Sequence, residues 1–169
     1  MIQVRIAGVA LDSAQQHVIL LKPVDELPQE GRLLPIWIGS QEATSILLAV
    51  EGAAVPRPLA HDLMRAMLDS LGATVTQVAV TRIDDGVFYA EVTLAAPAGM
   101  RVIDARPSDA VALASRVSAP IFVSEQVLDD AGLPDTLIEV DGDEGSDDDE
   151  RLDEFKRFLD DVDPDDFRG

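Results

Sequence analysis

Alternating and clustered apolar residues predict most of the strands. Apolar and polar residues alternate over residues 2–11, and an apolar run follows at 17–21, so we expect a first antiparallel pair of strands. The apolar run at 33–39 ends in a glycine and predicts a third strand. The dipeptide Asp85-Gly86 is the strongest hairpin signal in the chain. The remaining strands are predicted at 74–83, 87–95, 101–105 and 120–123.

Apolar residues at helical spacing predict four helices. In the segment 40–52 the inward face is expected to comprise Ala43, Ile46, Leu47 and Val50, with Ser40 as the cap. In the segment 58–71 the apolar stripe comprises Leu59, Leu63, Met67, Leu68 and Leu71. His61 lies about 200° from Leu59 around this helix, so we expect its side chain to point away from the core. The other helices are predicted at 107–117 and from Ser124 to Ala131.

Together these elements predict an α+β fold, a single domain over residues 1–135 with a mixed, largely antiparallel sheet and three to four helices. The segment 136–150 contains the run DGDEGSDDDE, which repels itself and has no apolar side chain for a core, so it predicts an acidic flexible linker. Residues 151–169 are predicted to form an acidic amphipathic segment with a short helix that ends before Pro164. Its apolar stripe comprises Leu152, Phe155, Phe158, Leu159 and Val162. This helix either folds back onto its own domain or a neighbour in an oligomer, or it docks on another protein.

Composition narrows the class of protein. The chain has 169 residues, with 32 acidic against 13 basic side chains, two histidines and no cysteine. The lack of cysteine excludes disulfides, zinc–thiolate sites and cysteine nucleophiles. The N-terminus lacks the pattern of a secretory signal, and no stretch approaches the roughly 20 apolar residues of a membrane span. We therefore expect a cytoplasmic protein with no membrane partner.

The formal net charge of −19 disfavours a polyanionic partner. Residues 141–169 hold 14 acidic and 4 basic side chains, which is more than half of that charge. We expect at most a weak nucleic acid substrate, with the acidic tail competing for an arginine-lined site. Truncation after residue 140 is then expected to raise binding or activity.

The first candidate site is the start of the helix at 58–71, with Arg57, His61 and Asp62. A histidine on the polar face near a helix start suits a general base or a metal ligand. The plainer interpretation is that Asp62 is the acid that any first turn favours and that His61 is solvated.

The second candidate site is a strand-to-helix turn with Asp104, Arg106, Ser108 and Asp109. Free amides at a helix start attract anions, so Arg106 is expected to clamp a phosphate with Ser108 as a further donor. In the alternative interpretation, Ser108 and Asp109 cap the helix and Arg106 pairs with Asp104 or Asp109.

The third candidate is Glu42, in the first turn of the helix at 40–52. Paired carboxylates with a histidine suit a divalent cation such as Mg²⁺ or Mn²⁺, so Glu42, His61 and Asp62 are the predicted metal ligands. Trp37 is the only tryptophan, and core packing is its expected role rather than stacking on a base. The sequence has no motif for an organic cofactor.

Three ordered blocks resemble the bifunctional nuclease domain of bacteria and plants: LPIWIGSQEATSILLAVEG, RPLAHDLMRAMLDSLGATV and VIDARPSDAVALASRVSAPIFVSEQVL. The resemblance covers roughly residues 1–135 and implies an oligomeric α+β domain and, for plant members, degradation of DNA and RNA. Ala60 stands where the family usually has a hydroxyl residue, which weakens the site if that hydroxyl contacts a ligand. The family's recurrent residues fall on Gly39, Glu42, Arg57, Pro58, His61, Asp62, Arg106, Pro107, Ser108 and Asp109.

Two hypotheses follow. In the first, the chain is a nuclease-like protein that hydrolyses DNA and RNA phosphodiesters with the help of a metal. His61 is then a base or metal ligand, the carboxylates are Glu42, Asp62 and Asp109, and the phosphate is held by Arg57, Arg106 and Ser108. In the second, the chain is a non-enzymatic homo-oligomeric module whose Arg-Pro helix starts bind an anion or shape an interface, while its acidic tail binds a protein partner.

Overall fold

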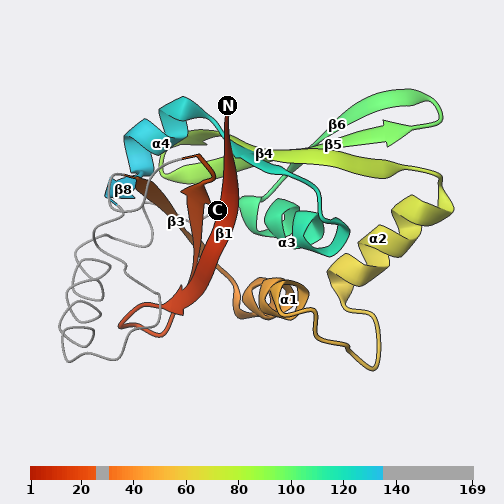
Figure 1. Ribbon diagram of the computed structural model, residues 1–169, viewed down its shortest axis with the longest axis horizontal. Coiled ribbons are helices and arrows are strands. Elements are labelled where there is room, and N and C mark those ends of the chain that lie inside the picture. Colours follow the sequence, from red (N-terminus) through yellow and green to blue (C-terminus); the bar gives the residue numbers. More distant parts are fainter. Residues whose placement is uncertain (26–30, 135–169) are drawn as a thin grey trace.

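The computed structural model describes residues 1–25 and 31–134, which form four helices and one eight-stranded sheet (Figure 1). The strands are β1 (Ile2–Leu11), β2 (His17–Pro23), β3 (Arg32–Ile38), β4 (Thr74–Asp84), β5 (Val87–Ala96), β6 (Gly99–Ala105), β7 (Ile121–Val123) and β8 (Leu133–Pro134). The helices are α1 (Ser40–Val50), α2 (Ala60–Ser70), α3 (Pro107–Val117) and α4 (Glu125–Ala131). The predicted α+β fold is confirmed. The predicted linker 136–150 and the tail 151–169 lie outside the described residues.

The sheet is mixed and largely antiparallel, as predicted. Its strand order is β6-β5-β4-β7-β1-β2-β3-β8, and only β4 and β7 pair in parallel. The turn between β4 and β5 places Asp85 at φ +47° and Gly86 at φ +76°. A two-residue hairpin turn whose twist matches that of the strands requires two residues in the left-handed conformation. The hairpin predicted from this dipeptide is therefore confirmed. The two-residue strand β8 was not predicted, because two residues give no periodic signal.

Helix α3 lies at the centre of the fold, between the sheet and the helices α1 and α2 (Figure 1). Seven of its eleven residues are buried, and most of them are alanine or other small or medium apolar residues. Small side chains let α3 approach the sheet and both neighbouring helices closely. Trp37 is 4% exposed in β3, and its Nε1 donates to Oδ2 of the buried Asp12 at 3.0 Å, so its predicted role in the core is confirmed. None of the helices in the described part of the chain is long and apolar enough to cross a membrane.

Helix α1 differs from its prediction in its cap and in part of its inward face. Gly39 is the N-cap and Ser40 is the first helical residue, so the prediction that Ser40 caps the helix is wrong. Leu47 and Val50 are 38% and 60% exposed, although both were predicted to face inward. The C-terminal half of α1 thus extends past the surface of the core.

The orientation of helix α2 differs from its prediction for His61 and for most of the apolar stripe. Its buried residue is His61, at 5% exposure, whereas Leu63, Met67 and Leu71 are 51%, 54% and 71% exposed. The prediction that His61 points away from the core is therefore wrong. The helix packs on α3 through the side that holds His61, where Leu68 also packs against the core, whereas Leu63, Met67 and Leu71 of the predicted stripe face outward.

Candidate functional site

The starts of α1, α2 and α3 each have an acidic residue at the third helical position: Glu42, Asp62 and Asp109. An acid at this position is favoured by the helix dipole and can reach back to the free amides of the first turn. Asp62 does so, since its Oδ2 accepts a hydrogen bond from the amide of Leu59 at 2.9 Å. Glu42 and Asp109 instead converge on one arginine.

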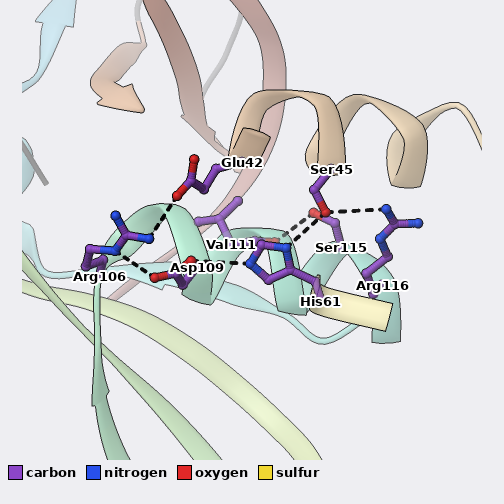
Figure 2. Close-up of polar contacts among 8 residues, drawn as sticks. All are labelled: Glu42, Ser45, His61, Arg106, Asp109, Val111, Ser115 and Arg116. Carbon is purple, nitrogen blue, oxygen red and sulfur yellow. Dashed lines mark hydrogen bonds and ion pairs between the residues drawn. The ribbon is translucent and has the colours of Figure 1, made fainter. Parts of the chain in front are cut away.

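That arginine is Arg106, the N-cap residue of α3, whose extended backbone directs its side chain between α1 and α3. Its Nε donates to Oδ2 of Asp109 at 2.7 Å, and its Nη2 donates to Oε1 of Glu42 at 2.8 Å (Figure 2). The hydrogen bond to Asp109 raises the pKa of the Arg106 guanidinium, with Glu42 adding in the same direction. The side chain is still 58% exposed, and within the described residues its Nη1 has no partner. The guanidinium is therefore charged, fixed in orientation and open to solvent on one side.

Gly39 makes room for Glu42. A Cβ atom at position 39 would overlap Oε2 of Glu42, because the carboxylate folds back over the N-cap of its own helix. The Glu42 side chain is 16% exposed, and only its Oε1 contacts Arg106. The recurrent glycine at this position is thus explained by sterics, since any side chain would displace the carboxylate.

His61 connects α2 to both other helices. Its Nδ1 lies 3.0 Å from Oγ of Ser45 in α1, and its Nε2 lies 3.3 Å from Oδ1 of Asp109 in α3 (Figure 2). Ser45 is 2% exposed, and its Oγ also accepts a hydrogen bond from Nη2 of Arg116 at 3.3 Å. A serine nucleophile needs access to substrate, so this Ser–His–Asp chain is a positioning network rather than a hydrolytic triad.

Arg116 and Ser45 are the residues of this network that sequence reasoning missed. Arg116 has an 8% exposed side chain, and its Nη1 lies 3.3 Å from Oδ1 of Asp62. The signals that point to them are weak: Ser45 interrupts the inward face of α1, and Arg116 is a charge in the last turn of a helix that is otherwise almost apolar. Neither signal separates a buried polar network from an ordinary surface position.

The predicted phosphate-binding residues do not all come together. Arg57 is exposed in the connection between α1 and α2 and forms no ion pair with any residue that the structure describes. Ser108 is 2% exposed in the first turn of α3, where it is not presented to solvent, and Arg106 takes the cap position instead. Of the two predicted partners of Arg106, Asp109 is the one it contacts, whereas Asp104 is exposed on β6.

The predicted metal ligands Glu42, His61 and Asp62 do not form one donor set. Both ring nitrogens of His61 already have partners, Asp62 faces Arg116, and Glu42 faces Arg106. Across residues 1–25 and 31–134, no group of three or more His, Asp or Glu side chains is arranged to hold a metal ion. These residues do not fit a shared divalent cation as they stand.

Comparison with known proteins agrees with the resemblance of the motifs. A model of the bifunctional nuclease domain matches residues 19–136. An uncharacterized protein of Mycobacterium tuberculosis is 43% identical over 171 aligned residues, covering 99% of this chain and 98% of that protein. Bifunctional nuclease 1 of Oryza sativa subsp. japonica is 30% identical, and Bifunctional nuclease 1 of Arabidopsis thaliana is 28% identical, each over 125 residues. These plant matches span 72% of this chain but only 37% and 38% of the plant proteins. The chain belongs to the bifunctional nuclease domain family.

Proposed function

We propose that this protein hydrolyses phosphodiester bonds of DNA or RNA at the cluster of Glu42, Arg106 and Asp109. The observation that supports this most directly is the exposed guanidinium of Arg106, fixed by two carboxylates from two different helices. Family membership points to the same chemistry, since relatives from rice and Arabidopsis are named bifunctional nucleases. It does not favour the alternative of a non-enzymatic module.

Arg106 is the group that binds the phosphate. Its Nε and Nη2 are held by Asp109 and Glu42, so the free Nη1 has a defined direction. A guanidinium with fixed geometry can direct its free Nη1 at a phosphoryl oxygen, and its charge offsets the charge that develops in the transition state. The N-terminus of α3 directly follows this residue and adds its positive dipole end.

Glu42 is the proposed general base. Its Oε1 is occupied by Arg106, while its Oε2 has no hydrogen-bond partner among the described residues. Both carboxylate oxygens of Asp109 have partners, so Asp109 is less free to take a proton. In the proposed step Glu42 takes a proton from water, the water oxygen bonds to phosphorus, and the bond from phosphorus to the leaving sugar oxygen breaks. That oxygen is protonated by solvent.

His61 and Asp62 have supporting roles in this proposal. His61 is buried and holds the Asp109 carboxylate, which in turn holds Arg106, so His61 is a positioning residue. Asp62 binds Arg116 and the amide of Leu59, and thereby fixes the start of α2. The divalent cation stays a prediction, and no step is assigned to it because the donor set does not fit. Homo-oligomer formation, a partner for the tail and a cytoplasmic location also stay predictions.

The test is cleavage of labelled single- and double-stranded DNA and RNA by the purified full chain. We expect Arg106→Ala and Glu42→Gln each to lower the cleavage rate by about 100-fold, in the range of losses for one transition-state contact or one general base. Arg5→Ala is the matched control, because it removes an equally positive, exposed side chain on β1 and should leave the rate unchanged.

Equal cleavage by the wild type, Arg106→Ala and His61→Ala would identify a contaminating nuclease and overturn the proposal. A wild type with no cleavage of any of the four substrates would also overturn it. If the cleavage rate falls as much in Arg5→Ala as in Arg106→Ala, the cause is the general loss of positive charge and not a local site.

A further inference from the structure

One chain of hydrogen bonds connects the last turn of α3 to the arginine at its start. It runs from Arg116 to Ser45 in α1 and on to His61 in α2. From there it returns to α3 at Asp109, which holds Arg106 (Figure 2). The four contacts measure 3.3, 3.0, 3.3 and 2.7 Å in that order. The chain therefore links a buried arginine to the exposed one through all three helices.

The groups at the two ends of this chain determine where its hydrogens lie. An arginine guanidinium has only donors, so Oγ of Ser45 accepts a hydrogen bond from Arg116. The carboxylate of Asp109, which is paired with Arg106, only accepts, so Nε2 of His61 must carry a hydrogen. A neutral histidine has one ring hydrogen, so Nδ1 is bare and accepts the hydroxyl hydrogen of Ser45. Every donor of the chain then faces an acceptor.

The opposite tautomer of His61 does not fit the same partners. With its hydrogen on Nδ1, the ring would turn a bare Nε2 toward Oδ1 of Asp109 at 3.3 Å, so that two acceptors face each other. A hydrogen on Nδ1 would also point at the Ser45 oxygen to which Arg116 already donates, and it would bring positive charge toward a buried guanidinium. The neighbours of the ring thus favour the tautomer with its hydrogen on Nε2.

A purely structural role does not explain Arg116. Its side chain is buried, its Nη1 lies 3.3 Å from Oδ1 of Asp62, and its Nε has no hydrogen-bond partner among the described residues. An unsatisfied buried donor destabilises a fold, and well-packed apolar side chains often replace buried ion pairs without loss of stability. The contact that only a donor can supply at this position is the one to Ser45.

We propose that Arg116 is a positioning residue that acts on the site through His61. Its contact with Ser45 keeps hydrogen off Nδ1 of the ring, so the ring donates from Nε2 to Asp109. The Asp109 carboxylate then has one oxygen on the ring and the other on Arg106, which fixes its rotation and the direction of the guanidinium. This inference rests on the proposed hydrolysis for its effect on cleavage, whereas the hydrogen positions follow from the contacts alone.

The first test is the nitrogen NMR spectrum of the imidazole ring in the full chain, labelled with a nitrogen isotope in histidine. The chain has two histidines, so His17→Gln leaves the signals of His61 alone. At about pH 8.5, where an ordinary histidine is neutral, we expect a bare Nδ1 and a protonated Nε2. A hydrogen on Nδ1, in the other tautomer or in a doubly protonated ring, would overturn the proposal. This spectrum needs no substitution in the hydrogen-bond chain, so it decides even if variants of Arg116 do not fold.

The second test is Arg116→Met, which removes the donor to Ser45 and keeps an unbranched side chain. We expect the Nδ1 signal to move toward that of a protonated nitrogen, and the cleavage rate to fall about tenfold with KM unchanged. Arg65→Met is the matched control, since the 56% exposed side chain of Arg65 on α2 pairs with Asp69, and it should change neither quantity.

Two results of this second test would overturn the role of Arg116. One is an Nδ1 signal that stays in place in Arg116→Met or moves as far in Arg65→Met. The other is full cleavage by Arg116→Met although its Nδ1 signal has moved. The spectra are recorded without substrate, so a wild type that cleaves nothing would overturn the proposed hydrolysis and leave the hydrogen positions to be decided by the spectra.

Discussion

Replacement of His61 tests whether this side chain attaches α2 to the rest of the fold. Its ring makes two contacts, 3.0 Å to Ser45 and 3.3 Å to Asp109, and α2 has no other buried residue. A hydrogen bond to a neutral partner contributes about 1 kcal/mol and one to a charged partner about 2 kcal/mol. His61→Ala also leaves a cavity, so we expect the free energy of unfolding to fall by about 3 to 4 kcal/mol.

The same estimate predicts a lower melting temperature. At about 2 to 4 °C per kcal/mol for a chain of this size, a loss of 3 kcal/mol lowers Tm by about 6 to 12 °C. His61→Phe fills most of the space without the hydrogen bonds, so its loss of about 3 kcal/mol measures the polar part alone and should lie at or below the loss in His61→Ala. Urea unfolding gives the loss in free energy of unfolding for both variants. In His61→Ala, amide hydrogen exchange should become faster in α2 while the amides of β4 stay protected. A loss below about 1 kcal/mol in His61→Ala, with α2 exchange unchanged, would refute the reasoning.

Four further predictions follow from single features of the structure. In Gly39→Ala the added methyl group displaces the flexible carboxylate of Glu42 and not the backbone. We therefore expect the free energy of unfolding in urea to fall by less than about 1 kcal/mol, whereas the cleavage rate should fall as much as in Glu42→Gln. Trp37→Phe leaves Oδ2 of the buried Asp12 without its indole donor and should cost about 1 to 3 kcal/mol in the same assay. EDTA should leave cleavage unchanged, because the proposed step uses only the chain's own groups. A loss of cleavage that Mg²⁺ or Mn²⁺ restores would contradict that step. Among the described residues of the site, Arg106 is the cation open to phosphate. The logarithm of the affinity for single-stranded DNA should therefore fall with the logarithm of salt concentration with a slope of about −1, and a slope steeper than about −4 would contradict binding through Arg106 alone.

The fold was predictable from the sequence where a local signal determines local structure. The β4–β5 hairpin follows from Asp85-Gly86, and α3 follows from an Arg-Pro start and a periodic apolar face, with both bounds as predicted. The strand order was not predictable in the same way. The parallel pair of β4 and β7 joins residues about 40 positions apart, and it depends on how α3, which comes directly before β7 in the chain, packs on the sheet.

The candidate site was predictable in its members but not in its arrangement. Glu42, Arg106, Asp109 and His61 stand at helix starts, and first-turn acids and an Arg-Pro cap are visible in the sequence. Which side of a helix packs inward is decided by the partner surface. For α2, the sequence argument gave more weight to a stripe of five apolar residues than to one histidine, although the histidine is the residue that has hydrogen-bond partners on both neighbouring helices.

The inward position of His61 links the site to the outer surface of α2. On its inner side α2 is held by His61, by the Asp62–Arg116 ion pair and by the partly buried Leu68, and the two polar contacts fix its orientation but bury little apolar surface. An intramolecular hydrogen bond that replaces hydrogen bonds to water contributes about 1 kcal/mol to the free energy of unfolding, whereas a fully buried leucine or methionine side chain contributes about 1.5 to 3 kcal/mol. The larger stabilisation available to α2 therefore lies on its outer face.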